Sequence, residues 1–107
     1  MRFAQKVEDF NSLIMTERIE AHLFISGLVQ GVFFRSETKR KADEIGVFGW
    51  VKNSPDGRVE AILEGEREKV EKLVEWIKKG PTGSRVDSVE LEFRKAKNQF
   101  QEFEIRY

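Results

Sequence analysis

Two amphipathic helical segments, each set between strand-like segments, constrain the fold of this 107-residue chain most strongly. The first spans residues 34–45 and carries Phe34, Thr38, Ala42 and Ile45 on one face. The second spans residues 66–79 and places its apolar residues at the i, i+3, i+4, i+7 spacing of a helix. Residues 19–25 precede the first helix and alternate between apolar and polar side chains, which predicts a strand with one buried face.

The remaining segments complete a regular order of elements. Residues 47–52 and 59–64 read as strands, and the Asn-Ser-Pro-Asp-Gly turn at 53–57 joins them as a hairpin. Residues 89–93 and 100–105 add two short strands. The order is β-α-β-β-α-β plus a short terminal strand. It predicts an α+β fold, the ferredoxin-like split β-α-β sandwich, with an antiparallel sheet and two helices on one face.

The chain divides into an N-terminal extension, residues 1–15, and one folded domain, residues 16–107. In the extension Phe3, Val7, Phe10 and Ile14 follow a helical period. We expect a flexible tail, because chain ends are usually mobile. The alternative is an amphipathic helix that docks on the domain or on a partner.

Composition excludes several function classes. The 19 basic and 19 acidic residues cancel, so no net charge favours nucleic acid or an anionic membrane. No cysteine is present, which excludes a disulfide framework, a thiolate nucleophile and a Cys-containing zinc site. No apolar run is long enough to span a membrane, and the N-terminus lacks the pattern of a secretory signal. We therefore expect a cytoplasmic monomer with neither a nucleic-acid nor a membrane partner.

The segment from Gly27 to Arg35 is the strongest candidate for a binding site. Its loop residues are Leu28, Val29, Gln30, Gly31, Val32, Phe33 and Phe34. The loop leads into a helix N-terminus, where unpaired backbone N–H groups and the helix dipole favour an anion. Two glycines allow the N–H groups to converge, and the planar guanidinium of Arg35 can bind two phosphate oxygens. Spacing alone does not distinguish a phosphate site from a plain strand–helix turn.

Asn53 is the second candidate, at the end of a predicted strand. Residues 54–57 already form a good type I turn, so the turn does not need Asn53. A neutral amide can hold a water beside a phosphate without adding a negative charge that repels the substrate.

The side chains that the sequence lacks limit the chemistry further. His22 is the only histidine, and we interpret it as a surface residue because it lies opposite the apolar alternation. No pairing of histidine with serine activates a nucleophile, and no spaced His, Asp and Glu set predicts a metal site. A hydrolase without these groups would act by positioning and electrostatics alone. That suits a phosphate compound whose leaving group departs without a proton from a general acid.

At these residues the sequence resembles the acylphosphatase family. Residues 27–35 fit the signature Gly-x-Val-Gln-Gly-Val-x-Phe-Arg, and residues 49–60 fit Gly-aromatic-Val-x-Asn-x-x-Asp-Gly-x-Val-Glu. The resemblance covers residues 17–107. It implies a cofactor-free enzyme that cleaves acyl phosphates to carboxylate and inorganic phosphate. It also implies that Arg35 and the loop amides bind the phosphoryl group and that Asn53 orients the attacking water.

Two alternatives stay open from the sequence. A non-catalytic module of the same fold could bind phosphate or another anion without hydrolysing acyl phosphates. An RNA-binding sheet is the other, because Phe48 and Trp50 lie in a strand of a ferredoxin-like fold. The balanced charge counts against RNA, and both aromatic residues are explained by packing on one face of the hairpin.

Overall fold

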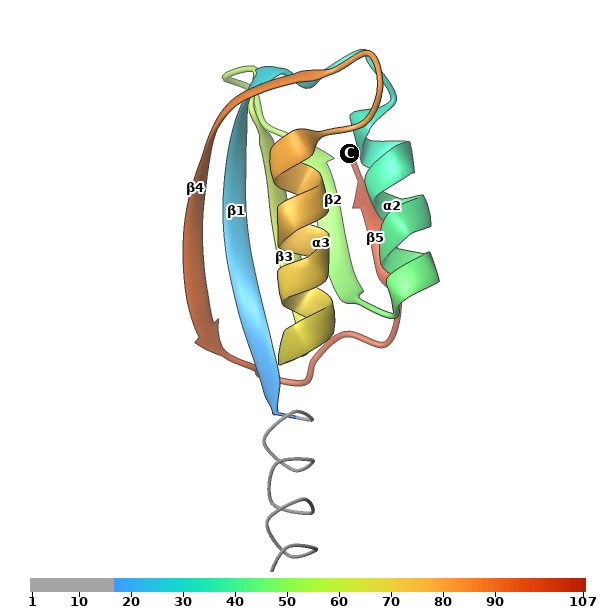
Figure 1. Ribbon diagram of the computed structural model, residues 1–107, viewed down its shortest axis with the longest axis vertical. Helices are drawn as coiled ribbons and strands as arrows, with labels where there is room; N and C mark the ends of the chain where they lie inside the picture. Colours follow the sequence, from blue (N-terminus) through green and yellow to red (C-terminus); the bar gives the residue numbers. More distant parts are fainter. Residues whose placement is uncertain (1–16) are drawn as a thin grey trace, which may run out of the picture.

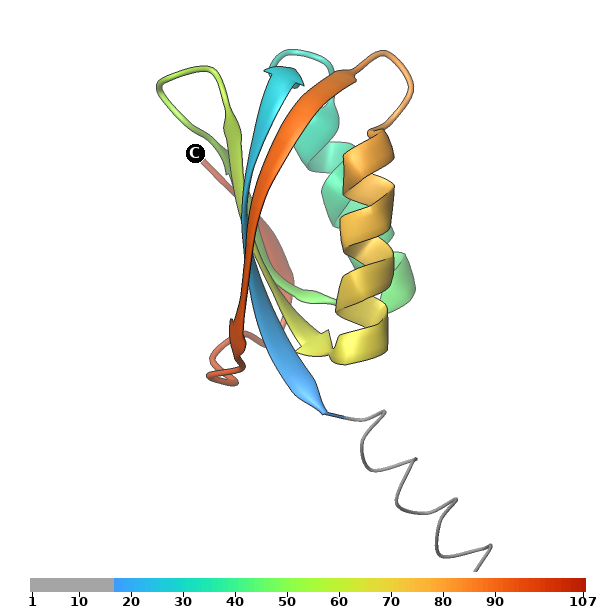
Figure 2. The same cartoon turned by 60° about the vertical axis from the view of Figure 1, so that its left-hand side comes forward.

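The computed structural model describes residues 17–107, and the predictions made for residues 1–15 lie outside this range. The elements in chain order are β1 (Arg18–Leu28), α2 (Phe34–Ile45), β2 (Phe48–Asn53), β3 (Val59–Glu66), α3 (Arg67–Lys79), β4 (Arg85–Lys95) and β5 (Phe103–Arg106). Both helices pack on one side of a single sheet (Figures 1 and 2). The predicted ferredoxin-like α+β sandwich is confirmed.

The sheet has five strands in the order β4-β1-β3-β2-β5. β1 pairs antiparallel with both β3 and β4, and β2 pairs antiparallel with β3. The terminal strand differs from the expected antiparallel sheet, because β5 pairs parallel with β2. After β4 the chain crosses one end of the sheet to the opposite edge (Figure 1), and β5 then runs back in the direction of β2.

The core lies between the helices and the inward face of the sheet. Ile19, Ala21, Leu23 and Ile25 of β1 are all buried, as their alternation predicts. They pack in one cluster with Leu73 and Ile77 of α3, Phe34 of α2 and Phe103 of β5. Burial of each such leucine, isoleucine or phenylalanine stabilises the fold by about 1.5–3 kcal/mol. This packing fixes where α2 begins, and therefore the position of the loop before it.

The last two strands depart most from their predicted bounds. β4 is longer than residues 89–93, and β5 begins at Phe103 rather than at residue 100. β4 is an edge strand whose outward side chains are charged, so only its middle shows an apolar pattern. The segment before β5 instead bonds to the buried carboxylate of Glu64, which accepts N–H donations from Lys97 (3.0 Å), Asn98 (2.8 Å) and Phe100 (3.4 Å).

The sheet face opposite the helices carries charges of both signs. Its aromatic residues contact cations: Arg58 lies 4.4 Å from the ring centre of Phe24, and Arg106 lies 5.1 Å from that of Trp50. His22 belongs to this face, with Nε2 at 2.7 Å from Glu60 Oε2. The glutamates of the face are Glu20, Glu60, Glu64, Glu90, Glu92 and Glu104. This mixture is unlike the basic surface that RNA binding requires.

Within residues 17–107, no helix is long and apolar enough to cross a membrane.

Candidate active site

The predicted site residues come together at one end of the sandwich. The β1–α2 loop, the β2–β3 turn and the end of β5 all lie there (Figure 1). They enclose a cleft of about 310 Å³. Its lining residues are Val29, Gly31, Phe33, Phe34, Arg35, Ser36, Asn53, Ile105 and Tyr107. None of these side chains is acidic, so the lining does not repel an anion.

The β1–α2 loop presents unsatisfied backbone donors to this cleft. Gly31 and Phe33 both adopt left-handed backbone angles, with φ of 77° and 63°. Among residues 17–107, no oxygen accepts a hydrogen bond from the backbone N–H groups of residues 30–36. These groups surround the N-terminus of α2, where the helix dipole adds a positive partial charge. The arrangement is typical of a nest for an anion.

The ends of the predicted loop belong to its neighbouring elements. Leu28 is the last residue of β1 and pairs with Arg85, and Phe34 is the first residue of α2 and is buried. Gly27 was expected to help the turn, but it lies within β1 at a bulge, after Ser26. A Cβ at residue 27 would collide with the carbonyl oxygen of Arg85, so glycine is needed there for close approach of β4.

Arg35 lies in the first turn of α2, and two contacts hold its guanidinium in place. Its Nη1 donates to the carbonyl oxygen of Arg106 (3.2 Å), and its guanidinium carbon lies 4.8 Å from the ring centre of Tyr107. No carboxylate of residues 17–107 forms an ion pair with Arg35. Its charge is therefore uncompensated, and its Nε and Nη2 donors are available to a phosphate.

Asn53 lies across the cleft, at the end of β2. Its backbone pairs with Val59, which places its side chain on the inward face of the sheet. The Oδ1 atom of Asn53 is buried and has no hydrogen-bond partner within residues 17–107. A buried amide oxygen without a partner is rare in folded proteins, and it can accept a hydrogen bond from a water in the cleft.

Gln30 joins the two halves of the site. Its Nε2 donates to the carbonyl oxygens of Ser54 and Arg58, both at 2.8 Å. Sequence reasoning placed Gln30 only among the loop amides and missed this link. The sequence indicated a role for Gln30 only in that the residue occupies a fixed position of the signature at residues 27–35. Ser36 and Tyr107 were also missed as lining residues, since neither carries chemistry that the sequence pattern can identify.

Within the part of the chain that the structure describes, no histidine, lysine or acidic side chain lines the cleft. His22 lies on the opposite face of the sheet and bonds to Glu60. Within the described range 17–107, no group of three or more His, Asp and Glu side chains could hold a metal ion. The lining instead combines unpaired backbone N–H groups, the guanidinium of Arg35 and the amide of Asn53.

Comparison with known proteins identifies the family of the chain. Residues 21–105 match the family model for acylphosphatase. The chain belongs to the acylphosphatase family. An acylphosphatase of Pyrobaculum islandicum is 53% identical over 90 residues, which cover 83% of this chain and 95% of that protein. An acylphosphatase of Rubrobacter xylanophilus is 45% identical over 105 residues, covering 98% of this chain and 94% of that one.

Acylphosphatase structures share the fold as well. The crystal structure of the Bacillus subtilis acylphosphatase superposes with a TM-score of 0.80 at 34% identity, and the match covers 83% of this chain and 99% of that chain. The family resemblance indicated by the two signatures is therefore confirmed. Acylphosphatases are hydrolases that act on acid anhydrides.

Proposed function

We propose that this acylphosphatase-family protein hydrolyses acyl phosphates to a carboxylate and inorganic phosphate, with Arg35 and Asn53 as its catalytic residues. One observation carries the proposal. One cleft is lined by Gly31 and residues 33–36, whose backbone N–H groups are unpaired within residues 17–107. The same cleft is lined by Arg35, which has no carboxylate partner, and by Asn53, whose Oδ1 is unsatisfied. Donors for a phosphoryl group and an acceptor for a water are thus placed together.

The phosphoryl group binds first. The unpaired backbone amides of the loop before α2 surround its oxygens, and the guanidinium of Arg35 donates from the side through Nε and Nη2. The contact of Arg35 with Arg106 and Tyr107 fixes the guanidinium before substrate arrives. Such preorganised donors stabilise the charge on the equatorial oxygens in the transition state without reorganising during the reaction. Inorganic phosphate, the product, binds the same donors and competes with substrate.

Water attacks from the side of Asn53. Its Oδ1 accepts one hydrogen bond from the water and directs the oxygen lone pair at phosphorus, in line with the departing carboxylate. The new bond joins the water oxygen to phosphorus, and the bond from phosphorus to the acyl oxygen breaks with its electron pair. The water's proton passes to a phosphate oxygen, since no side chain in the cleft lining is a base.

The absence of an acidic side chain in the cleft lining restricts the substrate. An alkyl phosphate releases an alkoxide, which needs a proton from a general acid. A carboxylate leaves without one. The site therefore suits carboxyl-phosphate anhydrides and would be slow with phosphate esters.

Hydrolysis of benzoyl phosphate in the presence of EDTA tests this proposal. We expect turnover that survives chelation and is lost in Arg35→Ala, while an alkyl phosphate such as ethyl phosphate is hydrolysed far more slowly. Arg67→Ala is a matched control, because Arg67 lies on α3 and pairs with Glu17 and Glu71 instead. A folded wild-type protein that binds phosphate but does not turn over benzoyl phosphate would favour the non-catalytic anion-binding module.

We also propose that the protein acts as a monomer, and its cytoplasmic location stays a prediction from the sequence. The described domain completes its cleft from its own elements, so a second subunit is not needed for the site. Sedimentation at several protein concentrations tests the oligomeric state.

A further inference from the structure

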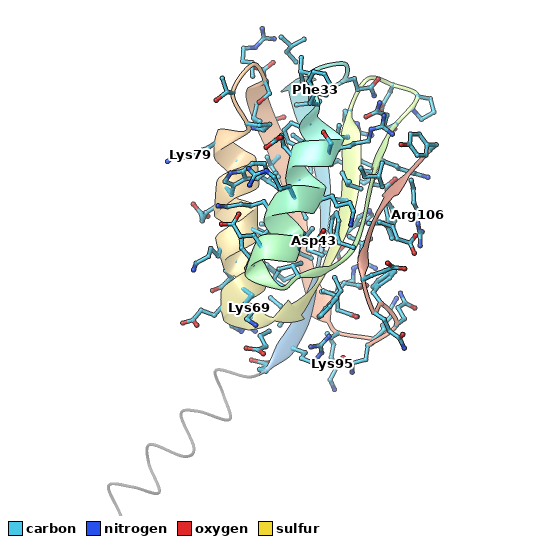
Figure 3. All side chains as sticks on the ribbon, turned by 90° about the vertical axis from the view of Figure 1, so that its right-hand side faces the viewer. Phe33, Asp43, Lys69, Lys79, Lys95 and Arg106 are labelled. Atoms are coloured by element: carbon cyan, nitrogen blue, oxygen red, sulfur yellow. The ribbon has the colours of Figure 1, made fainter. Side chains whose placement is uncertain are left out.

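Lys39 joins α2 to β5 one helical turn after Arg35. Its Nζ donates to the carbonyl oxygen of Phe103 at 2.9 Å. Arg35 donates to the carbonyl oxygen of Arg106 at 3.2 Å. Residues four apart lie on the same side of a helix, so two neighbouring side chains of α2 hold the first and last residues of β5. Figure 3 looks onto this side of the molecule, where α2 lies beside β5, with Asp43 labelled on the helix and Arg106 on the strand.

Few other contacts hold β5 in place. The strand has four residues, lies at the edge of the sheet and pairs with β2 alone. Within residues 17–107, the bonds from Lys39 and Arg35 are the only hydrogen bonds between α2 and β5. The buried side chain of Phe103 anchors the start of the strand but not its end. Regions with few buried contacts open locally at a low free-energy cost, so the position of the β5 end depends on its bonds to α2.

The orientation of the Arg35 guanidinium depends on that end of β5. The group is held by the carbonyl oxygen of Arg106 and lies 4.8 Å from the ring centre of Tyr107. If β5 shifts against α2, both contacts move together and the guanidinium loses its orientation at the cleft. A misplacement of about 1 Å can lower a reaction rate about 10²-fold. The bond from Lys39 opposes such a shift, because it fixes the strand to the next turn of the helix.

Lys39 is not itself a ligand for the substrate. Its side chain does not line the cleft. Its ammonium group also forms an ion pair with Asp43, at 3.0 Å, so its charge is compensated. Both side chains of this pair are exposed, and an exposed ion pair contributes little to stability. The hydrogen bond to β5 is therefore the contact through which Lys39 can act on the site.

We propose that Lys39 is a positioning residue for Arg35. It ties α2 to β5 and thereby holds the strand end against which the guanidinium is oriented. This inference rests on the proposed function, because it assumes that Arg35 binds the phosphoryl group. The alternative is that Lys39 only stabilises the exposed side of α2 through its ion pair with Asp43.

The first test measures the dissociation constant of inorganic phosphate by calorimetry and kcat/KM for benzoyl phosphate. Lys39→Met removes the donor but keeps the aliphatic stem of the side chain. We expect it to weaken phosphate binding about fivefold and to lower kcat/KM about tenfold, because a misplaced guanidinium loses most in the transition state. Lys39→Arg keeps a donor and should restore both values. Asp43→Asn removes the ion pair and should behave as wild type.

Lys78→Met is the matched control for Lys39→Met. Lys78 is an exposed lysine of α3 that pairs with Glu75 at 3.4 Å and does not line the cleft. It should leave both values unchanged. Urea unfolding of each variant shows that the proteins compared are folded under the assay conditions.

A double-mutant cycle separates positioning from a general structural role. Lys39→Met should weaken phosphate binding in the protein that has Arg35 and should have no further effect in Arg35→Ala. Equal losses in both backgrounds, or wild-type values in Lys39→Met, would overturn this inference while the hydrolase proposal stands. A wild-type protein that binds phosphate without hydrolysing benzoyl phosphate would refute the proposed function, and the phosphate cycle would still decide the role of Lys39.

Discussion

The side-chain nitrogen of Gln30 lies 2.8 Å from the carbonyl oxygen of Ser54, the residue that follows Asn53. A second bond of the same nitrogen reaches the carbonyl oxygen of Arg58, on the far side of the β2–β3 turn. One side chain thus fixes the distance between the loop that would bind phosphate and the strand end that would hold water. The two halves of the site come from separate elements, so their spacing depends on such a link.

Replacing Gln30 with leucine tests whether this link positions the water. The variant keeps the side chain's approximate size but removes both hydrogen bonds, so the carbonyl oxygens of Ser54 and Arg58 keep only their backbone N–H donors within the turn. We expect kcat for benzoyl phosphate to fall by about 10- to 100-fold, because a small misplacement of reacting groups costs this much. The inhibition constant of inorganic phosphate should change less, because the loop amides are retained.

Gln99→Leu is the matched control for this experiment, since Gln99 is exposed in the β4–β5 connection. It should behave as wild type. Equal kcat values in Gln30→Leu and wild type would show that the loop and the hairpin hold their spacing without this side chain.

The Arg35→Ala and Asn53→Ala variants should lose activity in different ways. Loss of the guanidinium removes charge that acts on both bound phosphate and the transition state. We expect Arg35→Ala to lower kcat/KM by about 10³-fold or more and to weaken inhibition by inorganic phosphate. Loss of the amide removes only the water's acceptor, so Asn53→Ala should lower kcat by about 10²-fold while phosphate inhibits as in wild type.

Asn53→Asp sharpens this comparison because it keeps the shape of the side chain. Its negative charge should weaken phosphate inhibition and lower kcat together. Steady-state kinetics with phosphate as inhibitor measures all three variants. Wild-type turnover in Asn53→Ala would remove Asn53 from the mechanism.

The order of elements could be predicted from the sequence because burial follows local periodicity in most of them. The bounds of α2, residues 34–45, agree with the prediction at both ends. Gly46 ends this helix as expected, with φ of 97° and its N–H bonded to the carbonyl oxygen of Ala42 (2.8 Å). In β1, the alternating residues predicted to face the core are all buried. These features depend on near neighbours in the chain.

Long-range contacts set the features that the sequence did not reveal. β4 extends to Arg85 and Lys95 because β1 offers it a full row of partners, whatever its own pattern. The left-handed angles of Phe33 arise where the loop must turn into a helix, and no local residue preference predicts them. For the candidate site, the two motifs identified Arg35 and Asn53. The contacts of Gln30, Tyr107 and Ser36 depend on how the loop, hairpin and last strand meet.

Glu64 should be important for stability rather than for activity. Its carboxylate is fully buried and accepts three backbone N–H groups from the β4–β5 connection, those of residues 97, 98 and 100. Glu64→Leu leaves all three donors unsatisfied, and we expect it to lower the free energy of unfolding by about 3 kcal/mol or more. Glu64→Gln keeps one acceptor oxygen and should lose about half as much.

Urea unfolding of the two Glu64 variants, followed by circular dichroism, measures these losses. Glu68→Leu is a control on the exposed surface of α3. Benzoyl phosphate turnover below the unfolding transition should stay near that of wild type, because Glu64 lies outside the cleft. A Leu variant as stable as wild type would show that water satisfies these donors equally well.

Asp56, in the turn after Asn53, should make stability depend on pH. The pKa of this carboxyl lies below its ordinary value of 3.8, chiefly because the carboxylate accepts a hydrogen bond from the backbone N–H of Arg58 (3.1 Å). A group whose pKa is lower in the folded state stabilises the fold above its unfolded pKa, and this contribution is lost as the pH falls through the lowered value.

Wild type should therefore exceed Asp56→Ala in free energy of unfolding by a constant amount from pH 7 to about pH 5. Below pH 3.8 the difference should shrink. Asp56→Asn keeps an oxygen acceptor for Arg58 but cannot ionise, so its advantage over Asp56→Ala should not change across this range. Urea titrations at closely spaced pH values measure the free energy of unfolding of all three proteins. If wild type stays more stable than Asp56→Ala by the same amount in strong acid, the hydrogen bond and not the charge carries the effect.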